Sequence, residues 1–430
     1  MSKKNGSNII AVITMIFLFG MIAFVTNLAA PIGNIWKMQD GIEGSNTLGM
    51  MGNMMNFLAY AIMGIPAGRL LKRKGYKFTA EAALLIGLIG VFVQYLSGVL
   101  FVGATIGSIP TSFFVYLLGA FICGFSVCML NTVVNPMLKI LGGKRSNQYI
   151  QIGGSFNSTL GTLTPMLVGA MIGTLSKNTQ ISDVNTLLFM AMGVFALAFI
   201  ILLFIPIENP EIKEVEGQVE NPMKYTHFVL GAIAIFVYVG VEVGIPGTLN
   251  FYLSDPVKGA GMDPSTAVAI AGFVAGTYWF LMLIGRLVSS LISGKISSKA
   301  QLTTVSAVAL LLIVLAIFLG NSSTVSMPVF TGKGFGMVQV PIAALLLVLC
   351  GLCTSVMWGT IFDLAVEGLG SATEKAAGIF MAMVVGGGIV PLLQNFVADK
   401  VSYMASYWVL AACVAFILYF AAIGSKVKKN

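Results

Sequence analysis

The sequence predicts an all-α polytopic membrane protein whose twelve transmembrane helices form two six-helix halves. Of its 430 residues, 57% are hydrophobic and 9% are charged, whereas a soluble domain carries roughly 25% charged residues. Apolar stretches of about 18 residues or more recur along the whole chain, and each is long enough to cross a bilayer. The Gly-Arg-Leu of residues 68–70 returns at 285–287, and the pattern of 161–165 returns at 387–391. Such an internal repeat favours two related halves.

The helices follow one another with short polar connections. The first begins after Lys3 and Lys4 and is too long for a signal peptide, so it is kept as a membrane helix. An acidic, polar stretch at 208–220 cannot enter a bilayer, so we divide the chain into an N-terminal half (1–207), a cytoplasmic linker (208–225) and a C-terminal half (226–430). The expected helices lie at about 9–36, 46–71, 78–102, 186–207, 226–254, 264–293, 301–319, 340–367, 374–398 and 402–423, and two more lie within 123–165.

The basic residues set the orientation. Of 24 Lys and Arg, five fall on one predicted side and the remaining 19 on the other. The positive-inside rule therefore puts both termini in the cytoplasm, and the net charge of +8 needs no nucleic acid partner to explain it. The five cysteines lie in apolar segments and the only histidine is His227, so we expect no metal site and no cofactor.

Two polar stripes lie side by side in the middle of the first half. Asn131 and Asn135 share one helix face at i, i+4, and Gln151 begins a second stripe that continues through Ser155, Ser158 and Thr162. Lipid offers these groups no hydrogen-bond partner, so they must face the protein interior or a water-filled cavity. Hydrogen bonds between packed helices are the alternative, but two facing stripes favour a binding cavity.

Glu242 is the one carboxylate that we place near the middle of the membrane. A buried carboxylate costs a few kcal/mol even on lenient insertion scales, which indicates a function; a structural ion pair is the alternative. The helix around it contains Gly240, Gly244, Pro246 and Gly247, and we expect a break there whose freed carbonyls would help to hold a cation.

The chain resembles the fucose–galactose–glucose:proton symporter family of the major facilitator superfamily from about residue 17 to 399. The resemblance rests on Leu-Asn-Thr-Val-Val-Asn-Pro at 130–136, Ser-Phe-Asn-Ser at 155–158, Ile-Pro-Ala-Gly at 65–68, Ile-Gly-Arg at 284–286, Thr-Ile-Phe at 360–362 and Gly-Gly-Gly-Ile-Val at 386–390. It implies sugar import by alternating access between two six-helix halves. In the family pattern, helix 1 carries an Asp and helix 4 a Glu as proton-linked carboxylates. Here these positions are Asn27 and Asn131, which cannot titrate, so coupling to H⁺ or Na⁺ is expected to run through Glu242.

Amides that both donate and accept suit sugar hydroxyls, and aromatic faces suit the sugar's CH groups. The candidate substrate-binding residues are Asn27, Asn131, Asn135, Gln151, Asn157, Tyr238, Asn250, Tyr278, Trp279, Trp358, Gln394 and Asn395. Glycines and charges near the predicted cytoplasmic helix ends suggest a gate made of Gly64, Gly68, Arg69, Arg73, Arg286, Asp363 and Glu367. An Asp is expected at position 68 in the wider superfamily, so one part of the usual gate is missing.

The leading interpretation is a secondary active transporter that imports a mono- or small oligosaccharide, coupled to H⁺ or Na⁺, as a monomer in a cytoplasmic (inner) membrane. An uncoupled facilitator, or a carrier of a nucleoside or short peptide, is the alternative. An intramembrane enzyme is disfavoured because no His-Glu-x-x-His motif or Ser–His pair is present. A sensor or scaffold is disfavoured because of the repeated halves.

Overall fold

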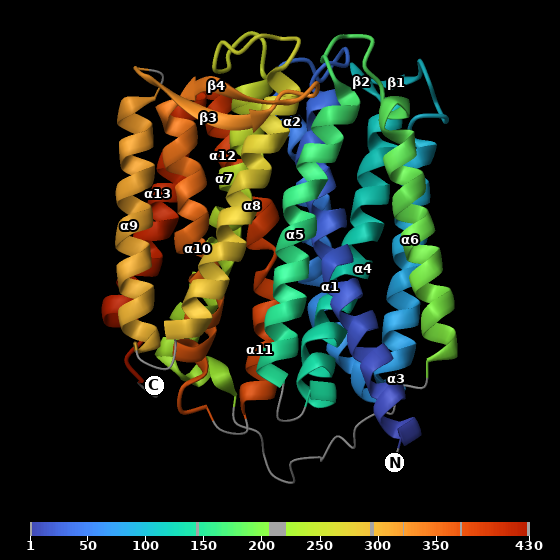
Figure 1. The fold of residues 1–430 in the computed structure, drawn as a ribbon, viewed down its shortest axis with the longest axis vertical. Helices are drawn as coiled ribbons and strands as arrows, with labels where there is room; N and C mark the ends of the chain where they lie inside the picture. Colours follow the sequence, from blue (N-terminus) through green and yellow to red (C-terminus); the bar gives the residue numbers. More distant parts are fainter. Residues whose placement is uncertain are drawn as a thin grey trace.

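Long helices run between the two ends of the molecule (Figure 1). The computed structural model describes residues 2–142, 146–205, 221–292, 296–320, 322–369 and 372–427. Within them the helices and strands are, in order, α1 Ser2–Trp36, α2 Asn46–Gly49, α3 Met51–Leu96, β1 Thr105–Ile106, β2 Ile109–Pro110, α4 Thr111–Gly142, α5 Ser146–Ile172, α6 Asn185–Phe204, α7 Thr226–Ser254, α8 Ala267–Ile292, α9 Ser298–Leu319, β3 Thr324–Phe330, β4 Phe335–Pro341, α10 Ile342–Val366, α11 Thr373–Met383, α12 Gly386–Lys400 and α13 Tyr403–Tyr419. The described part also has 3₁₀ turns at Ile181–Val184 and Pro222–Lys224 and a π turn at Phe420–Gly424.

Twelve crossings agree with the predicted fold class. Ten spans of the described chain are long and apolar enough to cross a membrane. One of them, α3, has 46 residues and would be roughly 69 Å long if straight, about twice the apolar thickness of a bilayer. Counting α3 as two crossings gives eleven, and the more polar α5 is the twelfth.

The bend in α3 replaces the loop that we expected between the second and third helices. Gly75 has φ 85° and ψ 175°, a backbone conformation that only glycine adopts without strain. The chain reverses at this residue, so the basic run 72–77 forms a tight turn. The helix that follows ends at Leu96 rather than near residue 102.

The expected break in the seventh helix is wrong, and the break lies in the eleventh helix. α7 is continuous through Pro246, and its glycines make room for a neighbouring helix: a side chain at Gly240 would collide with Val390, and one at Gly244 with Gln394. The predicted helix 374–398 instead divides into α11 and α12 before Gly386, where the chain passes against the carbonyl of Phe236. Close helix packing in membranes selects small residues. The glycines of α7 indicate such packing, although the sequence pattern they form is also that of a helix break.

A strand hairpin that the sequence did not predict lies at the end of the bundle opposite the N-terminus (Figure 1). β3 and β4 pair antiparallel from Thr324 with Pro341 to Phe330 with Phe335. The hairpin joins α9 to α10 (Figure 1), and Phe335 of β4 packs against Phe273 of α8. It leaves the membrane-spanning part of both helices in the predicted place.

The helices form two groups around a central space. α3 packs against α4 and α6, and α1 against α5; in the second group α7 packs against α10 and α12, and α9 against α10. Between the groups, α5 contacts α8 and α3 contacts α11 and α12. At Gly64 the approach of α3 to α11 is so close that a Cβ atom there would lie 2.9 Å from the backbone nitrogen of Ala382. Residues 206–220, most of the predicted linker, lie outside the described residues, so the division into 1–207, 208–225 and 226–430 stays a prediction.

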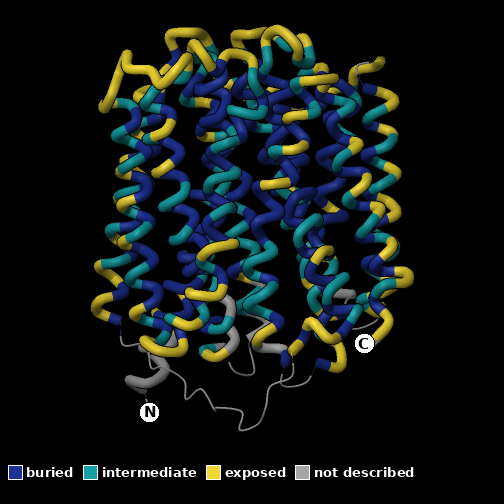
Figure 2. Tube along the Cα trace, turned by 180° about the vertical axis from the view of Figure 1, so that it is seen from behind, coloured by how far each residue is buried: buried dark blue, intermediate teal, exposed yellow. Residues whose placement is uncertain are grey.

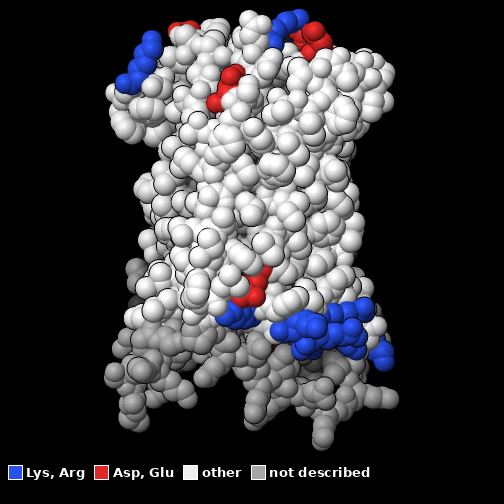
Figure 3. Space-filling model, turned by 90° about the vertical axis from the view of Figure 1, so that its right-hand side faces the viewer, with Lys and Arg blue, Asp and Glu red and all other residues white. Residues whose placement is uncertain are grey.

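Burial follows the expected pattern for a bundle in lipid. Figure 2 shows buried residues through the centre and exposed ones at both ends and along the outer helices. Exposed large apolar side chains such as Ile62, Phe280 and Phe318 lie in membrane-spanning helices, where lipid would cover them. Figure 3 shows Lys and Arg side chains gathered near the end where α1 begins, with few at the opposite end.

This charge distribution yields a first testable prediction. If the basic end is cytoplasmic, a cysteine replacing exposed Lys74 should react with an impermeant thiol reagent only after the cells are permeabilised. A cysteine replacing Asp40 should react in intact cells, and the native cysteines, four of them buried, provide a low background. Reaction of Lys74→Cys in intact cells would reverse the orientation.

Candidate functional site

A cavity of about 650 Å³ lies between the two groups of helices. Its walls come from α1, α3, α4 and α5 on one side and from α7, α8, α10 and α11 on the other. It extends from Asn27 and Trp279 to exposed Asp363, and it includes Ser298 at the start of α9. The cavity therefore reaches the end of the bundle that we expect to be cytoplasmic.

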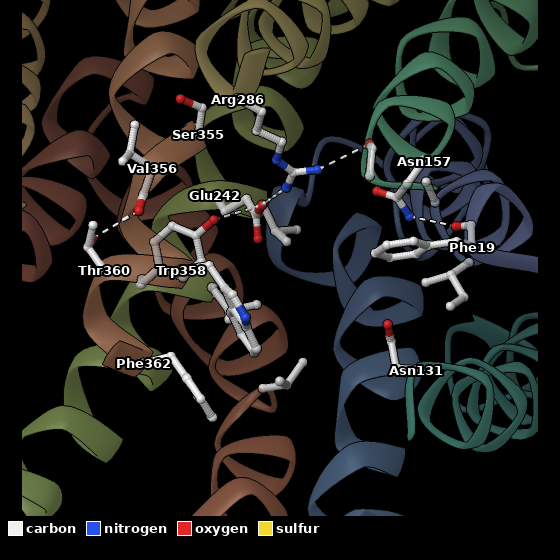
Figure 4. Close-up of a pocket in the computed structure, with 18 of the residues that line it drawn as sticks. Phe19, Asn131, Asn157, Glu242, Arg286, Ser355, Val356, Trp358, Thr360 and Phe362 are labelled. Atoms are coloured by element: carbon white, nitrogen blue, oxygen red, sulfur yellow. Dashed lines mark hydrogen bonds and ion pairs between the residues drawn. The ribbon is translucent and has the colours of Figure 1, made fainter. Parts of the chain in front are cut away.

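An ion pair lies in the wall formed by α7 and α8 (Figure 4). The Arg286 guanidinium is 3.8 Å from the Glu242 carboxylate, and their side chains are 24% and 15% exposed. The Tyr238 hydroxyl lies 2.9 Å from Oε1 of Glu242 and donates to it. Arg286 also donates to the Ser158 hydroxyl, at 3.0 Å, on α5 across the cavity. The pair thus connects the two groups of helices at the level of the cavity.

Three of the predicted amides lie in the wall of the cavity that the first group of helices forms. Asn27, Asn131 and Asn157 line the cavity. One N–H of each amide has a partner in the first group of helices: Asn27 donates to the carbonyl of Ala23 at 2.9 Å. Asn131 donates to the Tyr60 hydroxyl, and Asn157 to the carbonyl of Phe19, each at 2.7 Å. Each amide keeps its second N–H and its Oδ1, so this wall can both donate to and accept from the hydroxyl groups of a ligand.

Aromatic side chains complete the cavity. Trp279 and Trp358 line it, as does Tyr238, while Tyr60 and Phe57 lie on the opposite side. The two tryptophans add apolar ring surface to a cavity that three amides also line, a combination that suits an amphipathic ring.

Other predicted residues lie outside this cavity. Tyr278 is fully buried and its hydroxyl bonds to the Thr354 hydroxyl. Gln394 and Asn395 are buried in α12, where Asn395 donates to Thr248 of α7. The side chains of Asn135 and Gln151 lie outside the described residues.

The predicted gate residues separate into two sets. Arg286 pairs with Glu242 rather than with Asp363 or Glu367, so it lies deeper than we expected. Asp363 accepts a hydrogen bond from Ser298 at 2.5 Å and lines the cavity mouth. The remaining candidates lie on α3 or at the end of α10, where Gly64 is buried, Gly68 half-buried, and Arg69, Arg73 and Glu367 exposed.

A polar cluster closes the opposite end of the bundle. Lys37, which follows α1, lies 3.7 Å from Asp255 of the second group. The Tyr403 hydroxyl joins this pair, at 3.1 Å from Lys37 Nζ and 2.7 Å from Asp255. The Asp399 carboxylate accepts from the backbone N–H of Asn46 and Thr47 and from two side-chain hydroxyls. We call Lys37, Asn46, Asp255, Asp399 and Tyr403 the outer cluster.

Burial in this cluster affects Lys37 most. Its side chain is 4% exposed, and burial lowers the pKa of its ammonium group from 10.5 to about 8, although Asp255 and Asp399 act in the opposite direction. For Asp255, burial is outweighed by the charge of Lys37 and by hydrogen bonds, so its pKa is lowered. The cluster thus holds the Lys37 ammonium group in a place where its charge is less well solvated than it would be in water.

A smaller cavity of about 30 Å³ lies between the main cavity and the outer cluster. Thr26, Asn27, Val243 and Trp279 line both cavities. Asn250, predicted as a substrate ligand, lines the smaller one and accepts from Asn34 at 2.6 Å.

The sequence reasoning missed Tyr60 and the outer cluster. Tyr60 continues a stripe with Asn53 and Asn56 at i, i+3 and i+7 of one helix face, a signal that was available in the sequence. Lys37 appeared only as one of five outer basic residues, since nothing in the sequence brings it next to residues more than two hundred positions away.

Comparison with known proteins identifies the family. Residues 10–384 match the model of the Major Facilitator Superfamily. The chain is 29% identical over 438 aligned residues to a glucose/galactose transporter of Brucella abortus biovar 1, covering 99% of this chain and 96% of the relative. It is 28% identical to a putative glucose/galactose transporter of Helicobacter pylori, with 87% of each chain covered. It is 22% identical to the L-fucose-proton symporter of Escherichia coli, covering 87% of this chain and 84% of the relative.

Solved structures agree on the fold. The Escherichia coli fucose:proton symporter superposes with a TM-score of 0.66 at 19% identity, covering 96% of this chain and 98% of that one. A D-xylose-proton symporter superposes with a TM-score of 0.64 at 14% identity, covering 98% and 99%. With a family model spanning most of its length and this arrangement of helices, the chain belongs to the major facilitator superfamily.

Proposed function

We propose that this chain imports a sugar by alternating access and that accumulation is driven by a cation whose binding depends on Glu242. Superfamily membership makes the protein a transporter and not an enzyme. The relatives named for glucose, galactose and fucose support the substrate class. The observation that carries the proposal is the set of three amides that line one cavity together with two tryptophans.

The structure suits one half of a transport cycle. Its cavity reaches the basic end of the bundle while the outer cluster joins the two groups of helices at the other end. In the opposite state these outer contacts must separate and the gap near Asp363 must close. We further propose that the protein works as a monomer in the bacterial inner membrane with both termini in the cytoplasm.

Substrate affinity tests the amide wall. A lost hydrogen bond to a buried ligand group costs roughly 1–3 kcal/mol, which corresponds to about five- to 150-fold in affinity. Asn157→Ala and Asn131→Ala should therefore raise the KM for uptake of a labelled hexose in proteoliposomes by this factor. The control is Tyr278→Phe, whose hydroxyl faces Thr354 and not the cavity; its KM should stay within about twofold. An unchanged KM in both Asn variants would mean that the amides only join helices.

A panel of labelled sugars in the same vesicles tests the substrate class. Uptake or counterflow of at least one hexose supports the proposal. Transport of a nucleoside or dipeptide with no response to any sugar would replace it.

A further inference from the structure

The reversal of α3 gathers positive charge at the basic end of the bundle. Between positions 69 and 81 the chain carries five basic residues and one acidic residue. Because the chain reverses at Gly75, charges from both arms of α3 come together there. Arg69, Arg73 and Lys74 are exposed, and Figure 3 shows Lys and Arg side chains gathered at this end. We call these three residues the basic turn.

The one carboxylate of this segment does not neutralise the basic turn. Glu81 pairs with Lys77, whose Nζ lies 3.8 Å from its Oε1. The same ammonium group donates to the carbonyl of Leu203, close to the end of α6, at 2.9 Å. Within the described chain, no carboxylate lies at ion-pair distance from any residue of the basic turn. The three cations are therefore available to an anion that does not belong to this part of the chain.

An exposed apolar stripe begins where the basic turn ends. Phe78, Leu85, Ile89 and Phe92 lie at i, i+7, i+11 and i+14 on one face of the second arm of α3. Their side chains are between 41% and 53% exposed. The Lys74 ammonium lies 6.0 Å from the centre of the Phe78 ring, so the charge and the stripe are in contact. The stripe extends roughly 21 Å along the helix, more than the ~15 Å of one apolar leaflet.

We propose that the basic turn binds the headgroup of an anionic phospholipid whose acyl chains lie along this stripe. The lipid phosphate would accept from the guanidinium groups of Arg69 and Arg73, which are four residues apart on one helix face. Lys74 would add a second kind of cation at the boundary between headgroup and chains. The interaction requires no sugar and no ion gradient, so it does not depend on the proposed function.

The position of the charges favours a lipid over a soluble partner. A nucleic acid or an acidic protein would find the cations but would leave the adjoining apolar stripe unused, whereas one phospholipid matches both. A net negative headgroup is favoured over phosphatidylcholine, because choline compensates the charge of its own phosphate. The alternative is that the cations only set the orientation of the chain during insertion. That alternative predicts no preference between headgroups.

Lipid binding can be measured on the purified full-length protein in detergent. Titration with phosphatidylglycerol should raise the unfolding temperature at lower concentrations than phosphatidylcholine with the same acyl chains. Arg73→Gln/Lys74→Gln should need roughly 25-fold more phosphatidylglycerol for the same shift, because each cation near an anionic lipid contributes about fivefold to the affinity. Both side chains are exposed, so the fold should tolerate the change.

A fluorescent residue in the stripe tests where the lipid lies. Phe78→Trp adds an indole next to Lys74 while keeping an aromatic ring at this position. In nanodiscs, the fluorescence that this variant adds to the wild-type signal should be quenched more by brominated phosphatidylglycerol than by brominated phosphatidylcholine. Combining it with Arg73→Gln/Lys74→Gln should remove the difference between the two lipids. Equal quenching by both lipids without these changes would overturn the proposed site.

The matched control removes two charges elsewhere at the same end of the bundle. Lys224, before α7, and Lys299, in the first turn of α9, are exposed and lie outside the basic turn. Lys224→Gln/Lys299→Gln should keep the wild-type response to phosphatidylglycerol within about twofold. An equal loss in this control would show a general effect of charge and overturn the inference. A shift produced by inorganic phosphate or glycerol phosphate at similar concentrations would also overturn it, because the site would then bind a soluble anion.

Discussion

Glu242→Gln should abolish accumulation of sugar against a gradient and leave exchange intact. Glutamine keeps the shape of the side chain and an oxygen that accepts from Tyr238, at 2.9 Å in the wild type. It removes the only membrane-embedded carboxylate among the described residues that line the main cavity away from its mouth. Without that charge, no cation can replace Arg286 as the ionic partner of residue 242. Movement of the sugar is then no longer coupled to movement of the ion.

The measurement compares two modes of transport in proteoliposomes. Gradient-driven uptake by Glu242→Gln should reach only the outside concentration, while counterflow with equal sugar on both sides should continue. Asp363→Asn is the matched control, since Asp363 lines the same cavity at its exposed mouth and should keep accumulation. Full accumulation by Glu242→Gln would exclude this residue from coupling.

An unpaired Arg286 could itself disturb the cavity. Removing one partner of a buried ion pair often costs more than removing both. We therefore expect the double variant Glu242→Gln/Arg286→Gln to show at least the counterflow of the single one. If both variants accumulate sugar, the 3.8 Å contact between these side chains is a structural ion pair only.

The fold was largely predictable because the bilayer imposes length and polarity on each helix. Each predicted span is helical over most of its described residues, and the ends agree where a polar loop follows directly, as at Trp36 and Ser254. Glycine patterns were harder to interpret. In α7 they mark close packing against α12, and at Gly75 and Gly386 they mark the true changes of direction. The β3–β4 hairpin lies outside the membrane, where that constraint does not act.

The site was predictable only where one helix carried the signal. A polar stripe on one face indicated Asn131, the suitability of amides for sugar hydroxyls indicated Asn157, and an isolated carboxylate indicated Glu242. The partner of Glu242 was missed because Arg286 lies near a helix end in sequence, while its long side chain reaches back to Glu242 and to Ser158. Pairs such as Lys37 with Asp255 depend on how the two groups of helices meet, and no single segment contains that information.

The outer cluster should open when Asp399 is replaced by alanine. Its carboxylate accepts from the backbone nitrogens of Asn46 and Thr47 at 2.7 and 2.9 Å, and from the Thr47 and Ser45 hydroxyls at 2.6 and 3.2 Å. All four donors belong to the first group of helices, so these bonds exist only while the outer end is closed. Hydrogen bonds to a charged group contribute about 1.5–3 kcal/mol each, so losing even two should shift the equilibrium toward the outward-open state by at least roughly 100-fold.

A cysteine at Asn34 reports this shift. Asn34 is 2% exposed and bonds to Asn250 between the two groups. Labelling of Asn34→Cys from outside should be at least about tenfold faster with Asp399→Ala than without it. Lys400→Ala, on the adjacent exposed residue, should leave the rate unchanged, and equal rates in all three proteins would show that the cluster does not hold the end closed.

The same assay should depend on pH through Lys37. Its pKa is about 8 in the closed cluster because burial disfavours the charged form. Once hydrated in the open state, the group should return to its ordinary value of 10.5. Between these pH values the open state binds more protons, so raising the pH favours the closed state.

The rate of labelling of Asn34→Cys should therefore fall from pH 8 toward pH 10.5. Dividing it by the rate for an exposed Asp40→Cys cancels the effect of thiol ionisation. Lys37→Met should remove this dependence, because no proton is then released on closing, and a fall that persists in Lys37→Met would assign it to another group.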